Sequence, residues 1–407
     1  MSYAKVKLGG YIDILSGFTF KSKDFTDTGI PVIKIKNVQP PYVTLEDLSY
    51  VPNDIAEKSQ KFLLQYNDVL IALTGSHINQ MASVVGRVAR VKYSLPSLLN
   101  QRVGKITSKN NALCDIDFVY YYLSQNKVKI QLAREAGGAA NQANISPSDV
   151  KDLEIPFPCI EIQRRIADIL SAYDNLIENN QKQIKLLEEA ARRLYKEWFV
   201  DLRFPGHETT PVVDGVPEGW EQQSLGRIAS VLRRGISPKY DDNGKYFVIS
   251  QKCIRRSIMD ISEVRRESRD YSLELNLQDK DTVICSTGTG TLGRVGQVFG
   301  VYQNTTFDSH VTLVRTKEYQ NFIYQSIKYQ QEFLMGMGRG STNQQELYRG
   351  VIEGLLILVP TQEILNKADN ILSAIHDKIT ALNSQIGLLV EARDRLLPKL
   401  MSGEIEV

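Results

Sequence analysis

Apolar residues recur at alternating steps of three and four in two long stretches of the chain. The first stretch runs from about Ile160 to Trp198 and the second, in the same phase, from about Glu363 to Leu397. A sustained period of about 3.5 residues predicts helices whose apolar seams stay against a partner helix, as in a coiled coil. The expected seam positions are Ile166, Leu170, Tyr173, Ile177, Asn180, Ile184 and Leu187 in the first helix, and Leu372, Ile375, Ile379, Leu382, Ile386 and Leu389 in the second.

The connectivity predicts that these two helices pair with each other. The first leaves one globular segment and enters the next, so the second must run back antiparallel to it. Asn180 is the polar seam residue and is expected to fix the register at some cost in stability. Pro398 is expected to end the second helix. A helix of this length is a spacer of roughly 50 Å.

The rest of the chain alternates short β-like runs with loops rich in Gly, Asn, Ser and Pro. Runs such as Pro31 to Ile35 and Asp68 to Ala72 predict strands. A helix is expected over Phe118 to Glu135, followed by an extended Ile155 to Pro158 because prolines exclude helix there. The predicted fold class is therefore α+β, with mixed α/β domains separated by the two long helices.

The chain is also an internal duplication. Asp168 to Ala172 returns as Asn370 to Ala374, and the same offset relates Gly138 to Gly340 and Pro158 to Pro360. A period near half the chain implies two homologous modules related by an approximate symmetry axis rather than a solenoid. The expected division is residues 1–157 for the first domain, 158–200 for the first helix, 201–358 for the second domain, and 359–407 for the second helix and C-terminal tail.

Polar loops fall at corresponding places in the two modules. Asn, Gln, Arg, Ser and Thr are suited to hydrogen bonding with the edges of DNA bases. Turn formation alone is the alternative explanation for each of these residues. The candidate DNA-binding residues are Thr74, Ser76, His77, Asn79, Gln80, Gln101, Arg102, Asn141 and Gln142 in the first module, and Thr287, Thr289, Thr291, Arg294, His310, Arg339, Ser341, Thr342, Asn343 and Gln344 in the second.

Composition and charge narrow the class of protein. An apolar fraction of 42%, four separated cysteines and no long apolar run predict a cytoplasmic protein without a membrane partner. The net charge of +2 neither requires nor excludes a nucleic acid. Residues Arg227 to Arg269 are locally basic and interleaved with Tyr240, Tyr246 and Phe247, which fits a nucleic-acid surface or a solvated basic face equally well.

Motifs that resemble catalytic signatures do not fit their context. Gly288 to Gly293 matches GxGxxG, but a β-branched, glycine-broken segment follows where a dinucleotide site needs a helix, so a hairpin connection is expected. Gln39 to Tyr42 approaches an amino-methyltransferase signature but lacks its leading Asn or Asp. The four histidines show no metal-ligand spacing. We expect neither a catalytic residue nor a metal site.

Several segments together resemble the specificity subunits of Type I restriction-modification enzymes, nearly end to end. Ile155 to Gln163, followed by Ile166 to Leu170, resembles the family's proline segment entering its first spacer helix. Leu194 to Val200 with Arg203 to Glu208, then Val216 to Trp220, resembles its exit into a second recognition domain. In the second half of the chain, the corresponding segment Leu358 to Glu363 resembles the family's proline segment less closely.

The resemblance implies a non-catalytic subunit with two target-recognition domains. Each domain would read one half of an asymmetric, bipartite site in double-stranded DNA, while the helices set the gap. Two methyltransferase subunits carrying S-adenosylmethionine would dock on the helical region, and restriction subunits using ATP and Mg would join them. The chain itself would need no cofactor. Self-association of isolated chains through the helices is left open.

Two other classes of function are compatible with parts of the pattern. A self-contained DNA methyltransferase with divergent motifs would have to bind S-adenosylmethionine itself, and the absence of cofactor motifs argues against it. A coiled-coil assembly protein without DNA contact would show no DNA shift even with methyltransferase subunits present.

Overall fold

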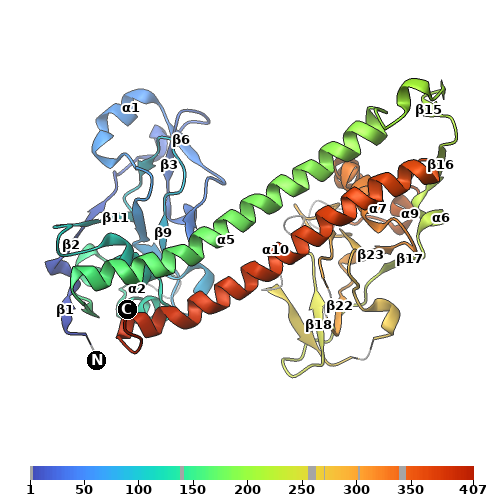
Figure 1. Ribbon diagram of the computed structural model, residues 1–407. Coiled ribbons are helices and arrows are strands. Elements are labelled where there is room, and N and C mark those ends of the chain that lie inside the picture. Colours follow the sequence, from blue (N-terminus) through green and yellow to red (C-terminus); the bar gives the residue numbers. More distant parts are fainter. Residues whose placement is uncertain (1–2, 138–141, 255–262, 270, 301–302, 339–344) are drawn as a thin grey trace. The chain divides into compact units, whose positions relative to one another are not determined.

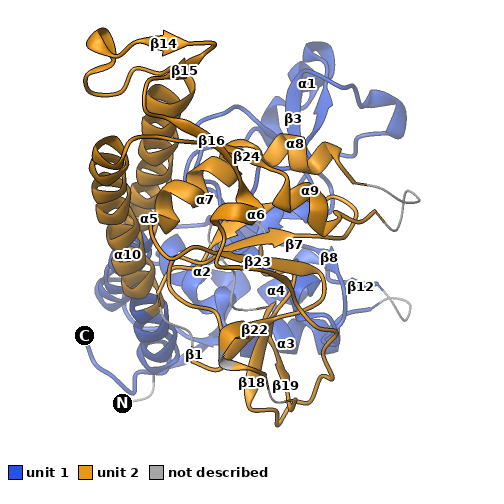
Figure 2. Cartoon of the chain, turned by 90° about the vertical axis from the view of Figure 1, so that its right-hand side faces the viewer, with its two compact units in different colours: residues 1–177, 388–407 blue, residues 178–387 orange. Residues whose placement is uncertain are grey.

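The computed structural model describes residues 3–137, 142–254, 263–269, 271–300, 303–338 and 345–407 (Figure 1). The chain divides into two compact units, coloured separately in Figure 2. Unit 1 consists of residues 1–177 and 388–407, and unit 2 of residues 178–387. Each unit therefore combines one globular domain with a part of each long helix.

Unit 1 opens with a mixed domain of short strands and helices. Its strands are β1 (Lys5–Lys7), β2 (Ile12–Ser16), β3 (Ile30–Ile33), β4 (Val38–Gln39), β5 (Tyr42–Val43), β6 (Ser49–Val51), β7 (Val69–Ala72), β8 (Thr74–Gly75), β9 (Val88–Arg90), β10 (Leu98–Leu99), β11 (Val103–Ser108), β12 (Ala143–Asn144) and β13 (Glu154–Pro156). Its helices are α1 (Asn53–Lys58), α2 (Ile116–Ser124), α3 (Asn126–Glu135), α4 (Pro147–Lys151), the start of α5 (Ile160–Tyr195) and the end of α10 (Gln362–Ser402).

Unit 2 has the same kinds of element. Its strands are β14 (Val212–Val213), β15 (Val216–Pro217), β16 (Glu221–Ser224), β17 (Val231–Arg234), β18 (Tyr246–Ile249), β19 (Arg265–Glu267), β20 (Thr282–Cys285), β21 (Val295–Gln297), β22 (Thr305–Phe307), β23 (Val311–Arg315) and β24 (Leu356–Val359). Its helices are the end of α5, α6 (Leu225–Ile228), α7 (Gln320–Tyr329), α8 (Gln331–Gly336), α9 (Arg349–Glu353) and the first part of α10.

The two domains repeat one strand order. The main sheet of unit 1 contains the run β2-β11-β7-β9, and that of unit 2 is β17-β23-β20-β21. A three-stranded sheet follows the same rule, since β10-β3-β6 corresponds to β22-β18-β19 and its first pair is parallel in both units. The duplication predicted from the sequence is therefore a duplication of the fold.

The middle strand of each main sheet forms the centre of its domain. All four residues of β7 and all four of β20 are buried, as expected for continuous β-branched and apolar runs that are covered on both faces. In unit 1, Phe118 of α2 packs in one cluster with Ile166 and Leu170 of α5. The domain and the long helix thus share a hydrophobic core.

The long helices pair antiparallel within each unit, as predicted. In unit 1, Ile166 of α5 shares a core with Leu400 near the end of α10. In unit 2, Ile184 of α5 clusters with Ile379 and Leu382 of α10. Asn180 is buried, and its amide Nδ2 donates to Gln385 Oε1 on α10 (3.3 Å).

The remaining seam positions are less uniform than the 3.5-residue period suggests. Ile166, Leu170, Ile177, Ile184, Leu372, Ile379 and Leu382 are buried, whereas Tyr173, Leu187, Ile375, Ile386 and Leu389 are half-buried. Asp174 and His376, which the pattern leaves out, are buried instead. The reason is that each helix also packs against a globular domain, so its buried face is wider than a seam of two positions per heptad.

Two boundary predictions were wrong. Pro398 does not end α10, which continues to Ser402 because Leu400 and Met401 are buried in the core of unit 1 and hold the last turn in place. The helix predicted over Phe118 to Glu135 is two helices, because Gln125 takes an extended conformation and its side-chain amide donates to the carbonyl of Tyr122 at the end of α2.

Among the described residues, no helix is both long enough and apolar enough to cross a membrane.

Candidate nucleic-acid interface

The three predicted loops of the first module meet at one end of the main sheet. Val103, where β11 begins, pairs with Ala72, where β7 ends, so the loop before β11 and the loop after β7 lie together. The third loop joins them because β12 pairs with β8. We call residues 74–80, 100–102 and 142–144 the loop end of unit 1.

Two of the predicted DNA contacts at this loop end point inward. Thr74 is 2% exposed and its hydroxyl donates to Asn144 Oδ1 (2.8 Å). Ser76 is 8% exposed and its hydroxyl donates to the carbonyl of Gln80 (2.7 Å). The Thr74 hydroxyl is bonded to a side chain and the Ser76 hydroxyl to a backbone carbonyl, so both side chains stabilise the loops from within.

The other predicted residues of the loop end face outward. Asn79, Gln80, Gln101, Arg102 and Gln142 are exposed and His77 is half-buried. The backbone of Arg102 is fixed, because its carbonyl accepts from Leu73 N (2.9 Å). Asn141 lies outside the described residues. The loop end therefore presents one guanidinium and several amides at the end of the main sheet.

Unit 2 builds the same loop end from different residues. Val311 of β23 pairs with Cys285 of β20, Ser286 N donates to the carbonyl of His310 (2.8 Å), and Thr287 bridges to Glu346. The loop end of unit 2 thus comprises residues 286–294, 308–310 and 345–346. Arg339, Ser341, Thr342, Asn343 and Gln344 lie outside the described residues.

The candidate DNA-binding residues of unit 2 differ in their exposure and in their hydrogen bonds. His310 and Thr289 are exposed, while Thr287, Thr291 and Arg294 are half-buried. The Thr287 hydroxyl contacts His310 Nδ1 (2.5 Å), and the Thr291 hydroxyl donates to the carbonyl of Thr287 (3.0 Å). Thr291 therefore stabilises the loop, and Thr287 orients the imidazole of His310.

Arg102 and His310 occupy equivalent positions in the two units. Each comes directly before the strand that starts at Val103 or Val311, and each donates its backbone N–H to the side chain two residues earlier, Asn100 in one case and Asp308 in the other. The same backbone frame thus carries a guanidinium in one unit and an imidazole in the other.

Several exposed cations of unit 2 lie on or near β18 and β19, and we call Lys239, Lys245, Lys252, Arg265 and Arg266 the basic strip. Arg265 lies over the ring of Tyr240 at 3.4 Å, Arg266 over Phe247 at 4.7 Å, and Lys245 over Tyr246 at 5.2 Å. These cations are exposed, as are Arg233, Lys239 and Lys252.

The basic strip reaches the loop end through one segment of chain. Ile236 bridges to Asp308, and the Ser237 hydroxyl donates to Ser309 Oγ (3.2 Å). In unit 1 the same step brings Thr19 to Gln101, whose Oε1 accepts from the Thr19 hydroxyl (2.8 Å). The sequence shows that this stretch is basic, but not that it lies beside the loop end, because only the fold brings Ser237 next to Ser309. Arg255 and Arg256 lie outside the described residues.

The glycine-rich segment of unit 2 is a turn, as predicted. Gly288, Gly290 and Gly293 have φ of 105°, 74° and 75°, which glycine adopts without strain. A Cβ on Gly293 would lie 2.5 Å from Met335 N. The segment leads from β20 into its antiparallel neighbour β21 and not into a helix, so it forms no dinucleotide site.

The segment Gln39 to Tyr42, which approaches the amino-methyltransferase signature, has its leading side chain engaged in contacts within the domain. The Gln39 side chain accepts from Arg87 Nη1 (3.3 Å) and donates to the carbonyl of Lys36 (2.8 Å), at the turn between β4 and β5.

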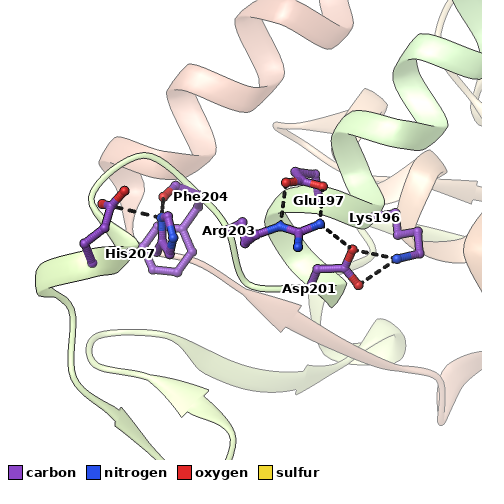
Figure 3. A network of polar contacts seen from close by, with 7 residues as sticks. Lys196, Glu197, Asp201, Arg203, Phe204 and His207 are labelled. Atoms are coloured by element: carbon purple, nitrogen blue, oxygen red, sulfur yellow. Dashed lines mark hydrogen bonds and ion pairs between the residues drawn. The ribbon is translucent and has the colours of Figure 1, made fainter.

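The segment after α5 folds back on itself through charged contacts (Figure 3). Arg203 forms two hydrogen bonds with the carboxylate of Glu197 (2.6 and 2.7 Å), and Asp201 accepts from Lys196 Nζ. Phe204 packs on Trp220 with ring centroids 4.7 Å apart. These contacts turn the chain from the long helix into the second domain.

Within the described ranges, no group of three or more His, Cys, Asp or Glu side chains is arranged to hold a metal ion.

A family model described as "Type I restriction modification DNA specificity domain" matches residues 2–189 and 217–392, one stretch in each half of the chain. The chain is 29% identical over 336 residues to the Type I restriction enzyme MjaIX specificity subunit of Methanocaldococcus jannaschii, covering 79% of this chain and 76% of that protein. It is 30% identical over 189 residues to the MjaVIII specificity subunit of the same organism, covering 46% of this chain and 43% of that protein.

A relative from Escherichia coli, the Type I restriction enzyme EcoKI specificity subunit, is 22% identical over 293 residues, covering 70% of this chain and 61% of that protein. The fold is similar to the crystal structure of a Type-I restriction-modification system S subunit from M. genitalium, with a TM-score of 0.59, 19% identity and coverage of 98% of this chain and 96% of that one.

Proposed function

Because the chain belongs to the family of Type I restriction modification DNA specificity domains, we propose that it is the subunit that gives such an enzyme its DNA sequence specificity. It acts as one subunit of a larger complex and contributes recognition rather than chemistry. The observation that carries this proposal is the repeated fold, in which two domains of one strand order present different side chains at equivalent loop ends.

Each domain reads one half of an asymmetric, bipartite site in double-stranded DNA. The exposed residues of each loop end contact base edges, and the basic strip of unit 2 contacts phosphates. Arg102 in one unit and His310 in the other are the first candidates for discrimination between the half-sites. This reading is supported by their equivalent backbone frames and by their exposure.

The long helices set the gap between the half-sites and carry the partners. An unbroken α5 of 36 residues is about 54 Å long, which exceeds the roughly 34 to 36 Å of one turn of DNA. Two methyltransferase subunits dock on the helical region, one for each module. They bind S-adenosylmethionine and extrude the target base, since chemistry on a base requires its extrusion from the duplex. Restriction subunits that use ATP and Mg join this core.

A methylation assay separates this proposal from a self-contained methyltransferase. The purified chain, mixed with DNA and labelled S-adenosylmethionine, should transfer no methyl group, and addition of the methyltransferase subunits should start transfer at defined sites. Methylation by the chain alone would overturn the proposal. Transfer by the methyltransferase subunits with no dependence on this chain would overturn it as well.

A further inference from the structure

A buried carboxylate in unit 1 ties the first domain to both long helices. Asp174 lies on α5 and is 8% exposed. It accepts one hydrogen bond from the hydroxyl of Tyr121 on α2 (2.7 Å) and another from Arg393 Nη1 on α10 (2.7 Å). One side chain therefore joins three elements that are far apart in the sequence. We call Asp174, Tyr121 and Arg393 the junction of unit 1.

Both donors of the junction keep their protons. Burial, reinforced by the neighbouring Asp174 carboxylate, raises the pKa of Tyr121 above its ordinary value, so the phenol stays neutral and donates. Burial alone would lower the pKa of Arg393, but its hydrogen bonds with Asp174 and Asp394 raise it, so the guanidinium stays charged. Asp174 thus accepts one hydrogen bond from a neutral phenol and one from a charged guanidinium, and both bonds are charge-assisted because the acceptor is a carboxylate.

The junction continues into the main sheet. The guanidinium of Arg90, on β9, lies 4.1 Å from the ring centroid of Tyr120 and 5.0 Å from that of Tyr121. Arg90 also pairs with Asp117 on α2 (3.0 Å). The sheet therefore holds α2 at the point where α2 meets the helices.

Unit 2 has a polar junction at the corresponding place, built from other residues. The offset that relates Leu170 to Leu372 relates Asp174 to His376. His376 is 2% exposed, and its Nε2 lies 2.9 Å from Asp279 Oδ1. Its ring stacks on Phe299 with centroids 4.6 Å apart. In both domains a buried polar residue at the same helix position of the repeat thus contacts the globular part of the domain, through α2 in unit 1 and through Asp279 in unit 2.

We propose that the junction of unit 1 positions the first recognition domain on the helices and so makes the complex selective for one gap length between the half-sites. This inference rests on the proposed function. Apolar packing is non-directional, so the shared core resists separation of domain and helix but opposes small rotations weakly. Two short hydrogen bonds to one buried carboxylate are directional and specify the angle.

The scale of the effect follows from DNA geometry. One additional base pair moves a half-site by about 3.4 Å along the duplex. It also turns the half-site by roughly 35° about the duplex axis, because one turn holds about 10 base pairs. A domain would therefore accept a neighbouring gap length only if it could both shift and rotate on its helices. Asp174, Tyr121 and Arg393 would act as positioning residues that need no contact with DNA.

The experiment uses the complex with its methyltransferase subunits and the two half-sites obtained by selection from a random DNA library. Binding is measured to a series of duplexes in which the gap is varied by one and two base pairs in each direction. For Tyr121→Phe, which removes one hydroxyl and keeps the ring, we expect discrimination against the neighbouring gaps to fall about tenfold. Base preference within each half-site should not change.

Two controls separate positioning from general stability. Tyr122→Phe removes the neighbouring hydroxyl on α2 and leaves both bonds to Asp174 in place, so the gap preference should stay as in the wild type. A double variant, Asp174→Leu with Arg393→Met, made in the Tyr121→Phe background so that no hydroxyl loses its acceptor, replaces the buried ion pair with apolar side chains of similar size. Such replacements often restore or raise stability, but they carry no directional bond, so the gap preference should still broaden.

Each outcome is decisive. An unchanged gap preference in Tyr121→Phe and in the double variant overturns the inference, while a split consensus for the wild type leaves the proposed function standing. An equal loss of affinity at every gap length in both variants would make the junction a stability element only and would also overturn the inference. If the wild-type complex selects no bipartite site, the proposed function itself has failed.

Discussion

Replacement of Arg102 by Ala should weaken recognition of one half-site and leave the other unchanged. The side chain is exposed at the loop end of unit 1, so its removal opens no cavity. Its backbone is held by the bond from Leu73 N to its carbonyl and by the bond from its own N–H to Asn100, and Arg102→Ala keeps both. The change therefore removes a cation while the frame of the loop stays in place.

The magnitude depends on what the guanidinium contacts. A bidentate contact with a guanine is worth about 1–3 kcal/mol, so its loss should weaken binding roughly 5- to 150-fold and relax the preference at one base pair. A contact with a phosphate should instead lower the slope of log affinity against log salt by about 0.9, with equal losses for all sequences.

The assay is a titration of fluorescent duplexes with the complex, in which each half-site is mutated one base pair at a time at several salt concentrations. Lys109→Ala is a matched control. Lys109 is an exposed cation just beyond the other end of β11, roughly 20 Å from Arg102 along the strand. It should leave both half-sites unchanged. Equal effects of the two variants, or equal losses at both half-sites for Arg102→Ala, would refute the reasoning.

Three further results are expected. Exchange of the Gly75–Gln80 loop for that of another family member should change the consensus of one half-site in a selection; a change in both would contradict modular reading. Arg315→Met removes the cation that pairs with the fully buried Asp281 carboxylate and should lower the free energy of unfolding by roughly 3–5 kcal/mol, measured by denaturant titration. The control Arg349→Met, which breaks an exposed ion pair with Glu353, should lower it by only about 0–1 kcal/mol. Leu170→Ala, at a fully buried helix position, should cost about 2–5 kcal/mol in the same assay, and a loss under 1 kcal/mol would mean that the helix does not depend on this core.

The paired helices and the duplication follow from local pattern. A heptad period is a property of neighbouring residues, and a repeated offset needs only the sequence. Neither reveals which other surface a helix packs against. The seam prediction therefore missed Asp174 and His376. Asp174 contacts Tyr121 of α2, and His376 contacts Asp279, which lies just before β20. Pro398 was misjudged because the core around Leu400 outweighs one missing backbone hydrogen bond.

The sequence locates the polar loops along the chain, but it does not show which of their side chains face solvent. The loops meet because Val103 pairs with Ala72, which alternation of apolar residues suggests but does not fix. Whether a small polar residue faces solvent depends on a partner distant in sequence. Thr74 faces inward because its hydroxyl bonds to Asn144, 70 residues later in the chain. Arg102 faces outward, where water solvates its charge.

The most direct test of the two-domain account is a selection from a random DNA library with this chain in complex with its methyltransferase subunits. The account predicts a split consensus with two unlike halves separated by a fixed gap. A single contiguous motif, or no enrichment at all, would contradict it and would assign the duplicated fold to protein assembly.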